Sequence, residues 1–423
     1  MERTYFCIDM KTFYASVECA ERNLNPFETN LVVADVTRGK NALCLAVSPK
    51  MKAQGIKNRC RLSEIPNHIN YIIAPPQMAL YIEYAADIYE IYLEYFSPDD
   101  IYVYSIDESF IDVTSYIEAY DMLPADFALK IMNDIANRLH IPSTCGIGSN
   151  LFLCKIALDI TAKHSRNHIG VLDEEIFYRT LWNHKPITDF WMIAQGTASR
   201  LAKYGIYTMR DITNAPTELL YRLFGINAEL LIDHAWGREP CIISDIKAYK
   251  AKSKSVSFSQ ILPRNYTYDE ARVVMREMTD HACMELMRRH SIAGGVYIGV
   301  GYSYGTREFE SASSRFGYST SLPSKIVPAS LEIFDSIADK NTPIRRLAIS
   351  FSGVCDESCE GYDFFTDWEE IEKEKSREKT VLGLMSRYGK NAVLKGNNYL
   401  KSATQRERNC MIGGHRAGND DKS

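Results

Sequence analysis

The segment Ile101–Val113 constrains the fold of this chain most, because it places two acidic residues between two runs of strand-forming residues. Aromatic and β-branched residues dominate both runs, which predicts a strand, a tight turn and a second strand. Asp107 and Glu108 lie at the predicted tip. Adjacent acids at a hairpin tip are usually a solvated turn. They could instead hold a divalent cation such as Mg²⁺, which prefers oxygen ligands, if a third carboxylate and phosphate-binding cations come from elsewhere.

A third carboxylate is available at the end of a predicted N-terminal strand. The apolar segment Tyr5–Asp9 has the composition of a buried strand, and residues 11–21 follow with helical spacing. Between residues 5 and 148 the predicted order is strand, helix, strand, strand, helix, strand, with an excursion near residues 30–75. This is the order of the split βαβ, or ferredoxin-like, fold, in which Asp9 and Asp107 would lie on neighbouring central strands. The sequence therefore predicts that the three acids come together.

The rest of the chain divides into a helical region, a second α+β domain and a tail. Beyond residue 165 the pattern predicts helices only, and residues 190–206 predict two helices joined by a glycine turn. Such a turn could bind a DNA phosphate or simply pack as a helical hairpin. The basic connector Lys247–Phe258 leads into helices and strands that predict a four-stranded sheet with one exposed face. The tail beyond residue 352 is polar, and only partial order is expected near its end.

Length and composition exclude several classes of protein. A chain of 423 residues is expected to form three or four domains, and 46% hydrophobic with 24% charged residues is typical of soluble globular proteins. No apolar run approaches the roughly 20 residues of a membrane span, and the N-terminus carries no secretory signal. The 11 cysteines form no paired CxxC pattern, so free thiols and a cytoplasmic location are expected.

The charge is divided along the chain. The net charge of −5 argues against a protein that simply coats nucleic acid. Residues 1–240 contain 22 Lys and Arg against 30 Asp and Glu, whereas residues 241–350 contain 15 against 11. An acidic body followed by a more basic segment is typical of an acidic metal site with a separate surface for a phosphate backbone.

Two motifs carry a resemblance to a known family. Ile8–Glu18 (IDMKTFYASVE) and Tyr104–Phe110 (YSIDESF) together resemble the Y-family lesion-bypass DNA polymerases, the UmuC/DinB or ImpB/MucB/SamB-like type, and within it the Gram-positive UmuC-like subgroup. The resemblance covers nearly the whole chain. It implies a multidomain α+β fold with a ferredoxin-like palm, small fingers, an all-α thumb with a helix-hairpin-helix, and an α+β little-finger domain. The implied boundaries are residues 1–10 and 76–165 for the palm, 11–75 for the fingers, 166–240 for the thumb, 241–352 for the DNA-binding little finger and 353–423 for the tail.

The resemblance also implies a site for two Mg²⁺ ions. Asp9 and Asp107 would bridge the ions, Glu108 would bind the ion nearer the primer 3′-hydroxyl, and the backbone carbonyl of Met10 would complete the ion on the nucleotide side. Lys11 stands where many relatives have Asp or Asn, so the local charge beside the ions differs. The implied reaction transfers a nucleotide from a dNTP to the primer end of primer-template DNA, in translesion synthesis during DNA repair and SOS-type damage tolerance.

Further residues are implied to bind the nucleotide. Tyr14 resembles the steric-gate aromatic residue whose ring would clash with a ribose 2′-hydroxyl, and the backbone amides of Phe13 and Tyr14 would meet the triphosphate. Lys52 and Lys163 resemble triphosphate-binding lysines. The spacing from Lys155 to Lys163 is one residue longer than is usual in the family.

A possible partner and two other functions complete the sequence-based expectations. Residues 361–365 resemble the family's sliding-clamp-binding peptide without its leading Gln, so Tyr362, Phe364 and Phe365 either bind the replication clamp or simply pack. Another two-metal palm nucleotidyl enzyme would act on free nucleotide without primer-template. A non-catalytic clamp- or DNA-binding protein at stalled forks would not need all three acids.

Overall fold

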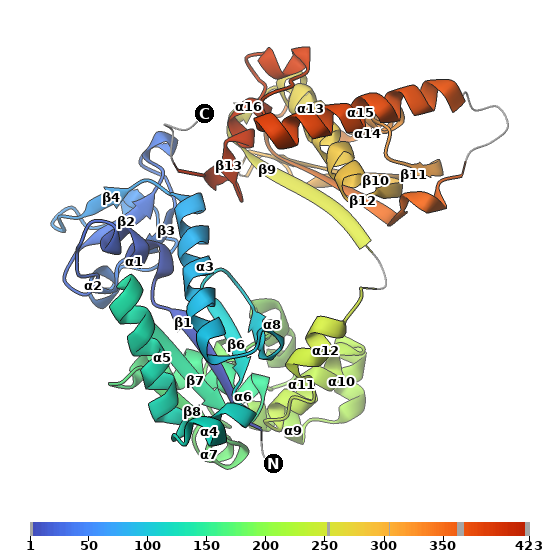
Figure 1. Ribbon diagram of the computed structural model, residues 1–423. Helices are drawn as coiled ribbons and strands as arrows, with labels where there is room; N and C mark the ends of the chain where they lie inside the picture. Colours follow the sequence, from blue (N-terminus) through green and yellow to red (C-terminus); the bar gives the residue numbers. More distant parts are fainter. Residues whose placement is uncertain (1–2, 252–253, 304, 362–367, 419–423) are drawn as a thin grey trace. The chain divides into compact units, whose positions relative to one another are not determined.

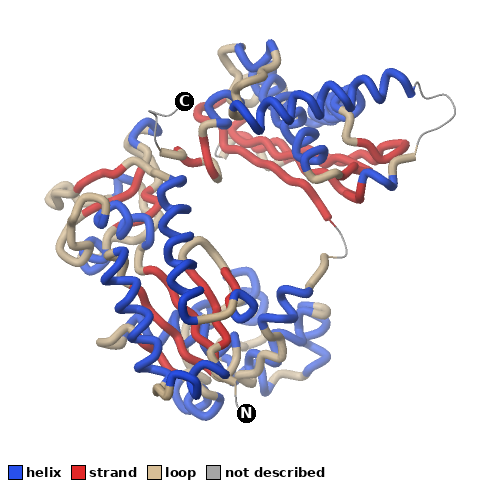
Figure 2. The backbone as a smooth tube through the Cα atoms, viewed as in Figure 1, coloured by secondary structure: helices blue, strands red, loops and turns tan. Residues whose placement is uncertain are grey.

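The structure is a computed structural model that describes residues 3–251, 254–303, 305–361 and 368–418. The chain divides into two units, of which the first runs to Tyr249 and the second covers Lys250–Ala417 (Figure 1). Each unit combines helices with a β-sheet of its own (Figure 2). The cysteines are all free, as their spacing predicts. Among the helices in the described ranges, none carries an apolar stretch that would reach across a lipid bilayer.

The first unit is built on a five-stranded sheet of order β5-β6-β1-β7-β8. Its strands are β1 (Tyr5–Met10), β5 (Ile101–Val103), β6 (Glu108–Asp112), β7 (Ser143–Gly148) and β8 (Ile169–Leu172). The central strand β1 is antiparallel to both β6 and β7. Helices α3 (Met78–Tyr95) and α5 (Pro124–Leu139) pack against each other on one face of the sheet (Figure 1). The order of these helices with β1, β5, β6 and β7 confirms the predicted ferredoxin-like fold.

The prediction of helices only beyond residue 165 is wrong at β8. Residues 169–172 form an edge strand parallel to β7, in which Ile169 pairs with Cys145. This strand has 4 residues and therefore carries too little pattern to be recognised locally. Its conformation depends on pairing with β7. The sheet consequently extends past the palm boundary predicted at residue 165.

The other face of the sheet is covered by an irregular helical segment. It consists of α6 (Leu151–Ile156), the π-helical turn η4 (Ala157–Thr161) and the 3₁₀ turn η5 (Ala162–His164) rather than one regular helix. The backbone of α6 lies directly on β7. A Cβ atom on Gly146 would come within 2.0 Å of the Cys154 carbonyl oxygen, and one on Gly148 within 2.2 Å of the Cys154 nitrogen. Glycine at these positions therefore permits the close approach.

A small sheet of order β3-β2-β4 forms where the fingers are predicted. Its strands are β2 (Leu31–Ala34), β3 (Cys44–Val47) and β4 (Ile72–Ala74), and its neighbouring helices are α1 (Phe13–Ala20) and α2 (Pro49–Ala53). Ser48 caps α2, because its hydroxyl accepts a hydrogen bond from the Met51 N–H at 3.4 Å. Gly55 has φ 86, a left-handed conformation suited to ending this helix. These features fix the position of Lys52 on α2.

A group of short helices follows the sheet. They are α7 (Glu174–Thr180), α8 (Gln195–Ala202), α9 (Met209–Asn214), α10 (Thr217–Phe224), α11 (Asn227–Ala235) and α12 (Ile243–Ala248). The predicted turn at Gly196 is wrong, because Gly196 lies inside α8 and the reversal comes earlier, where Met192 has φ 66. Ile243 of α12 is buried against Tyr5 and Phe110 of the sheet. The first unit therefore runs past the thumb boundary predicted at residue 240.

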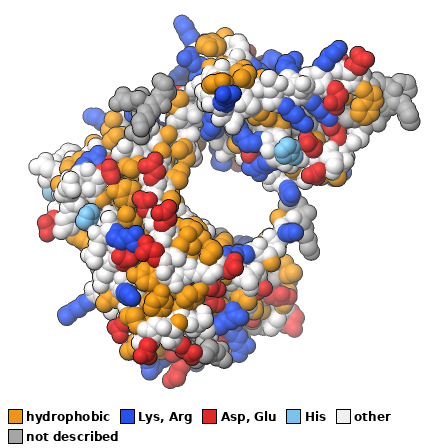
Figure 3. All heavy atoms as spheres, viewed as in Figure 1, with side chains coloured by type: hydrophobic (Ala, Val, Ile, Leu, Met, Phe, Trp, Pro, Cys, Tyr) orange, Lys and Arg blue, Asp and Glu red, His pale blue; other side chains and the backbone are white. Residues whose placement is uncertain are grey.

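The second unit contains a four-stranded sheet of order β11-β10-β12-β9, as predicted. Its strands are β9 (Lys254–Tyr266), β10 (Ser291–Tyr302), β11 (Glu310–Thr320) and β12 (Ile344–Asp356), and its helices α13 (Tyr268–Arg288) and α14 (Pro323–Ile337) pack together on one face. Along β12, Leu347, Ile349 and Phe351 are buried, whereas Arg346 is exposed. The predicted exposed sheet face is therefore present. Figure 3 shows Lys and Arg side chains on the visible surface of this unit.

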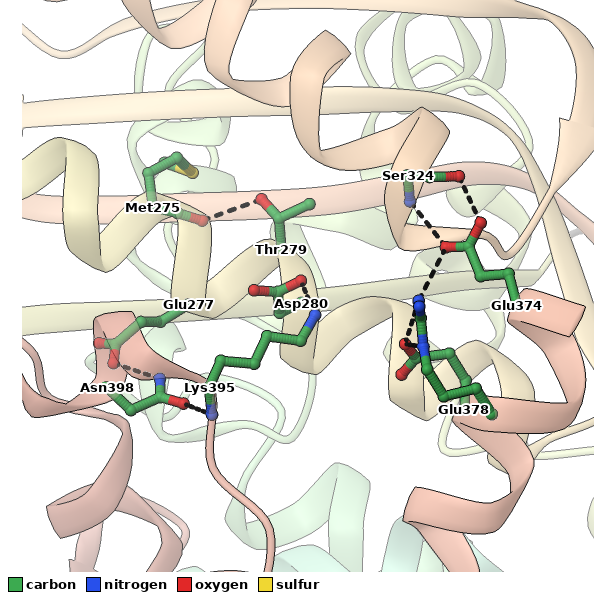
Figure 4. Close-up of polar contacts among 10 residues, drawn as sticks. Met275, Glu277, Thr279, Asp280, Ser324, Glu374, Glu378, Lys395 and Asn398 are labelled. Carbon is green, nitrogen blue, oxygen red and sulfur yellow. Dashed lines mark hydrogen bonds and ion pairs between the residues drawn. The ribbon is translucent and has the colours of Figure 1, made fainter. Parts of the chain in front are cut away.

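The expectation of only partial order near the end of the chain is wrong for residues 389–418. After α15 (Trp368–Tyr388), this segment forms α16 (Gln405–Asn409), β13 (Met411–Ile412) and β14 (His415–Arg416). Polar contacts attach it to α13 (Figure 4). The carboxylate of Glu277, which is 1% exposed, accepts hydrogen bonds from Asn398 Nδ2 at 2.6 Å and from the Thr404 N–H at 2.8 Å. Lys395 pairs with Asp280 at 2.6 Å. Such buried polar contacts cannot be predicted from the hydrophobicity of the local sequence.

Candidate active site

The predicted acids lie together at one end of the central strands. Asp9 on β1 is paired in register with Glu108 on β6. The Met10 N–H donates to the Asp107 carbonyl at 2.9 Å, which holds the hairpin tip beside the end of β1. Alternate residues of a strand share a face. Asp9 therefore projects from the same face as Cys7, on the side of the sheet that α6 covers.

Burial and neighbouring carboxylates both disfavour the charged form of Asp9. Together they raise its pKa from 3.8 to about 7, with burial as the largest cause, followed by the charges of Asp107 and Glu108. Lys163 and Lys155 oppose the shift without cancelling it. Three carboxylates whose charges disfavour one another form a donor set suited to a hard divalent cation. The residues present therefore fit a magnesium site.

Glu108 is paired with Lys155, for which the sequence predicts no role at the site. The Glu108 carboxylate lies 2.6 Å from Lys155 Nζ and accepts a hydrogen bond from Cys7 Sγ at 3.1 Å. Burial by itself lowers the pKa of Lys155, but the surrounding acidic groups raise it overall. Asp159 continues the series, because it pairs with Lys155 at 3.0 Å and with Lys163 at 2.9 Å. The spacing Lys155, Asp159, Lys163 in steps of four is the signal that could have predicted this series.

The ion pair with Lys155 engages the Glu108 carboxylate, which a metal ion would also need. Across the ranges that the structure describes, no three His, Cys, Asp or Glu side chains are arranged as a metal site. Asp107 accepts a hydrogen bond from the Ser105 hydroxyl at 2.7 Å. Binding a cation between the acids therefore requires the carboxylate of Glu108 to be shared with, or released from, Lys155.

Three lysines from three segments lie beside Asp9. Burial lowers the pKa of Lys52, and the positive charge of Lys163 lowers it further. The pKa of Lys11 is lowered by burial and by the charge of Lys52. The charge of Asp9 acts to raise the pKa of both Lys11 and Lys52. The predicted phosphate-binding residues Lys52 and Lys163 are thus brought together next to the acids, with Lys11 as a third cation.

The π-helical turn η4 accounts for the long spacing between Lys155 and Lys163. A π-turn contains one more residue than an α-helical turn, and it commonly marks a functional site. The additional residue is absorbed within residues 157–161. Lys163 therefore stays close enough to Lys52 and Asp9 for its charge to affect both.

Tyr14 lies beside the acids with its ring supported from α3. Its ring stacks on Tyr81 with centroids 4.5 Å apart and an interplanar angle of 16°. The Tyr81 hydroxyl donates to the buried carboxylate of Glu18 at 2.6 Å. Burial raises the pKa of Tyr14, and the charge of Asp107 raises it further, so the ring is near that carboxylate. The Tyr14 ring is thus held in a fixed position near Asp107.

Helix α1 begins three residues after Met10. The helix begins at Phe13, and Thr12 precedes it with φ 45 and makes no side-chain cap hydrogen bond. The first N–H groups of a helix have no intrahelical acceptor and favour anions. The amides of Phe13 and Tyr14 belong to this first turn. The residues of the predicted clamp peptide, Tyr362, Phe364 and Phe365, lie outside the described residues.

Comparisons with known proteins find family models and relatives that cover most of the chain. The family model described as the impB/mucB/samB family matches residues 8–159, and that of the impB/mucB/samB family C-terminal domain matches residues 253–363. UvrX of Bacillus subtilis (strain 168), whose name refers to repair of UV damage, is 30% identical over 98% of each chain. DNA polymerase IV 2 of the same organism is 28% identical over 98% of this chain and 99% of its own.

A solved structure extends the comparison to the fold. It is a Y-family DNA polymerase chimera with a TM-score of 0.66, 21% sequence identity, and coverage of 84% of this chain and 99% of its own. At this level of identity the likeness concerns the fold.

A further relative is similar in sequence over its full length. DNA polymerase IV 2 of Halalkalibacterium halodurans is 27% identical over 98% of this chain and 100% of its own. The similarity thus covers both units of the chain.

Proposed function

Because this chain belongs to the impB/mucB/samB family, we propose that it is a DNA-directed DNA polymerase that performs translesion synthesis. The observation that carries the proposal is the position of Asp9, Asp107 and Glu108 beside the phosphate-binding candidates Lys52 and Lys163. Relatives named DNA polymerase IV match nearly the full length and support the same activity. Primer-template DNA and a dNTP are the proposed substrates.

The acids would hold two Mg²⁺ ions. Asp9 and Asp107 are the proposed ligands for both ions. The Met10 carbonyl would complete the ion on the nucleotide side, and Glu108 would bind the ion nearer the primer 3′-hydroxyl. When bound, such ions activate the attacking hydroxyl and neutralise the leaving pyrophosphate. Lys155 would hold the Glu108 carboxylate in place until the ion binds, because its ammonium lies 2.6 Å from that carboxylate.

The remaining residues would position the nucleotide. Phosphoryl transfer depends on placing the reacting groups and neutralising charge more than on covalent help from the protein. Lys52, Lys163 and the first amides of α1 would orient the triphosphate. The Tyr14 ring, stacked on Tyr81, would exclude a ribose 2′-hydroxyl.

Primer extension on intact and lesion-bearing templates tests the activity. Asp107→Asn and Glu108→Gln should each lower extension by roughly a hundredfold or more, because charge neutralisation at the reacting phosphate is lost. Binding of primer-template should change little. Glu118→Gln, which alters an exposed acid on α4 (Thr114–Tyr120), is the matched control and should leave extension unchanged. Normal extension by either site variant would contradict the proposal.

Sugar discrimination tests the proposed gate. Tyr14→Ala should incorporate ribonucleotides much more readily than the unaltered chain, because the ring that meets the 2′-hydroxyl is gone. Tyr89→Ala, on the same helix as Tyr81, is the control and should keep normal discrimination. Unchanged discrimination in Tyr14→Ala would remove the gate from the proposal. Products formed from free nucleotide without primer-template would instead favour another two-metal palm enzyme.

A further inference from the structure

Lys11 contacts His168, and neither residue has a role in the reaction proposed above. Its Nζ lies 3.1 Å from Nδ1 of His168 and 3.4 Å from Nε2. A lysine ammonium has three N–H donors, and a neutral imidazole offers one acceptor nitrogen. One donor therefore satisfies His168, and two donors of Lys11 stay available to a ligand.

Both residues are fixed to the palm sheet by their backbones. The Lys11 N–H donates to the Pro142 carbonyl at 2.8 Å, immediately before β7. The His168 carbonyl accepts from the Cys145 N–H at 2.9 Å, within β7. His168 also has φ 60, an uncommon conformation for a residue with a side chain. Lys11 and His168 therefore belong to anchored segments. A side-chain contact between two such segments is suited to binding a ligand.

Lys11 has no acidic partner in the part of the chain that the structure describes. Its ammonium is half-buried, forms no ion pair with a carboxylate there, and lies within range of the like charge of Lys52. Lys52, which is exposed, likewise forms no ion pair among those residues. A half-buried cation without a carboxylate partner is costly unless an anion joins it. The Lys11 ammonium is therefore suited to an anionic ligand.

The position of Lys11 beside the acids indicates which anion fits. Lys11 directly follows Asp9 and Met10, the proposed metal ligands, and the Met10 N–H donates to the Asp107 carbonyl at 2.9 Å. Lys163 is joined through Asp159 and Lys155 to Glu108. In the proposed reaction the reacting phosphate of the nucleotide lies at the acids, so its terminal phosphates extend from the acids toward these cations. A triphosphate therefore brings the negative charge that Lys11 lacks.

From the contact between Lys11 and His168 beside Lys52, we propose that the two residues bind the terminal phosphates of the incoming nucleotide. Lys11 donates to the phosphate oxygens, and His168 is a positioning residue that holds the ammonium in place. The inference rests on the proposed polymerase function. The same contacts would hold the leaving pyrophosphate after transfer.

Nucleotide binding measured separately from chemistry tests this proposal. The dissociation constant of a dNTP and the maximal rate are obtained from rapid-quench primer extension at saturating Mg²⁺. Lys11→Met should raise the dissociation constant roughly tenfold to a hundredfold, which is the range for a lost hydrogen bond to a charged group. The maximal rate should change much less, because binding to the terminal phosphates is retained throughout the reaction.

Further variants separate a binding role from a structural one. Lys11→Arg should retain most of the affinity. His168→Asn, which suits the left-handed backbone, should raise the dissociation constant by a smaller factor than Lys11→Met. Lys50→Met, on the exposed side of α2, is the matched control and should bind dNTP normally. Inorganic pyrophosphate should inhibit Lys11→Met correspondingly more weakly than the unaltered chain.

Two results would overturn the inference. One is an unchanged dNTP dissociation constant in Lys11→Met. The other is a change confined to the Mg²⁺ concentration needed for half-maximal rate, since Lys11 would then act on the acids rather than on the nucleotide. If the unaltered chain itself fails to extend primers, the proposed polymerase function is refuted, and that outcome is distinct from both.

Discussion

At the scale of single residues, the site disfavours the negative charge of Asp9. Burial and two neighbouring carboxylates raise its pKa to about 7, so the folded chain binds a proton there more tightly than the unfolded chain does. Because the pKa is raised on folding, the resulting stability is present at low pH and is lost as the pH rises from about 4 through 7. The loss amounts to up to roughly 4 kcal/mol for a shift of this size.

Thermal unfolding against pH, in the presence of a chelator, checks this expectation. Asp9→Asn should be more stable than the unaltered chain at pH 8 and of similar stability near pH 4. Added Mg²⁺ should stabilise the unaltered chain at pH 8 and have little effect on the variant. A stability difference that does not depend on pH would show that Asp9 is not held in a repulsive cluster.

At the scale of elements, the close contact between α6 and β7 holds Lys155 beside Glu108. Gly146→Ala would place a methyl group 2.0 Å from a backbone oxygen of α6, which cannot yield without moving the helix. We expect a loss of stability of about 3 kcal/mol or more, together with slower primer extension. Gly196→Ala in α8 is the control, because nothing lies within 4 Å of the added methyl group. Chemical denaturation of both variants provides the comparison, and equal stability would contradict the assigned contact.

At the scale of the whole molecule, the C-terminal segment forms part of the second unit. Glu277→Leu would leave the Asn398 amide and the Thr404 N–H without their acceptor. We expect a loss of roughly 1–3 kcal/mol for each buried group left unpaired, and faster proteolysis within residues 395–405. Glu332→Leu, at an exposed position of α14, should not change the cleavage rate. If the Glu277→Leu segment stays protected, the anchoring does not depend on this carboxylate.

The sequence predicts those features of the molecule that rest on local pattern. Strand composition and helical spacing predict the ferredoxin-like order of strands and helices, which the structure shows between β1 and β7. The motifs around Asp9 and Asp107 predict that these acids meet. The pairing of Glu108 with Lys155 and of Lys11 with His168 is not predictable in this way, because each joins segments distant in the sequence. The same is true of β8, whose conformation depends on its neighbour, and of the tail, whose anchors are buried polar groups.

The π-helical turn η4 is also a position where the chain can lose a residue without shifting the segments on either side. Residues 157–161 contain one residue more than an α-helical turn over the same rise would need. Removal of one residue there would convert the bulge into regular helix while leaving both ends of the segment in place. Elsewhere in a helix a single deletion rotates all that follows by about 100°. This turn is therefore a place where insertions and deletions can be tolerated a few residues from a reactive centre.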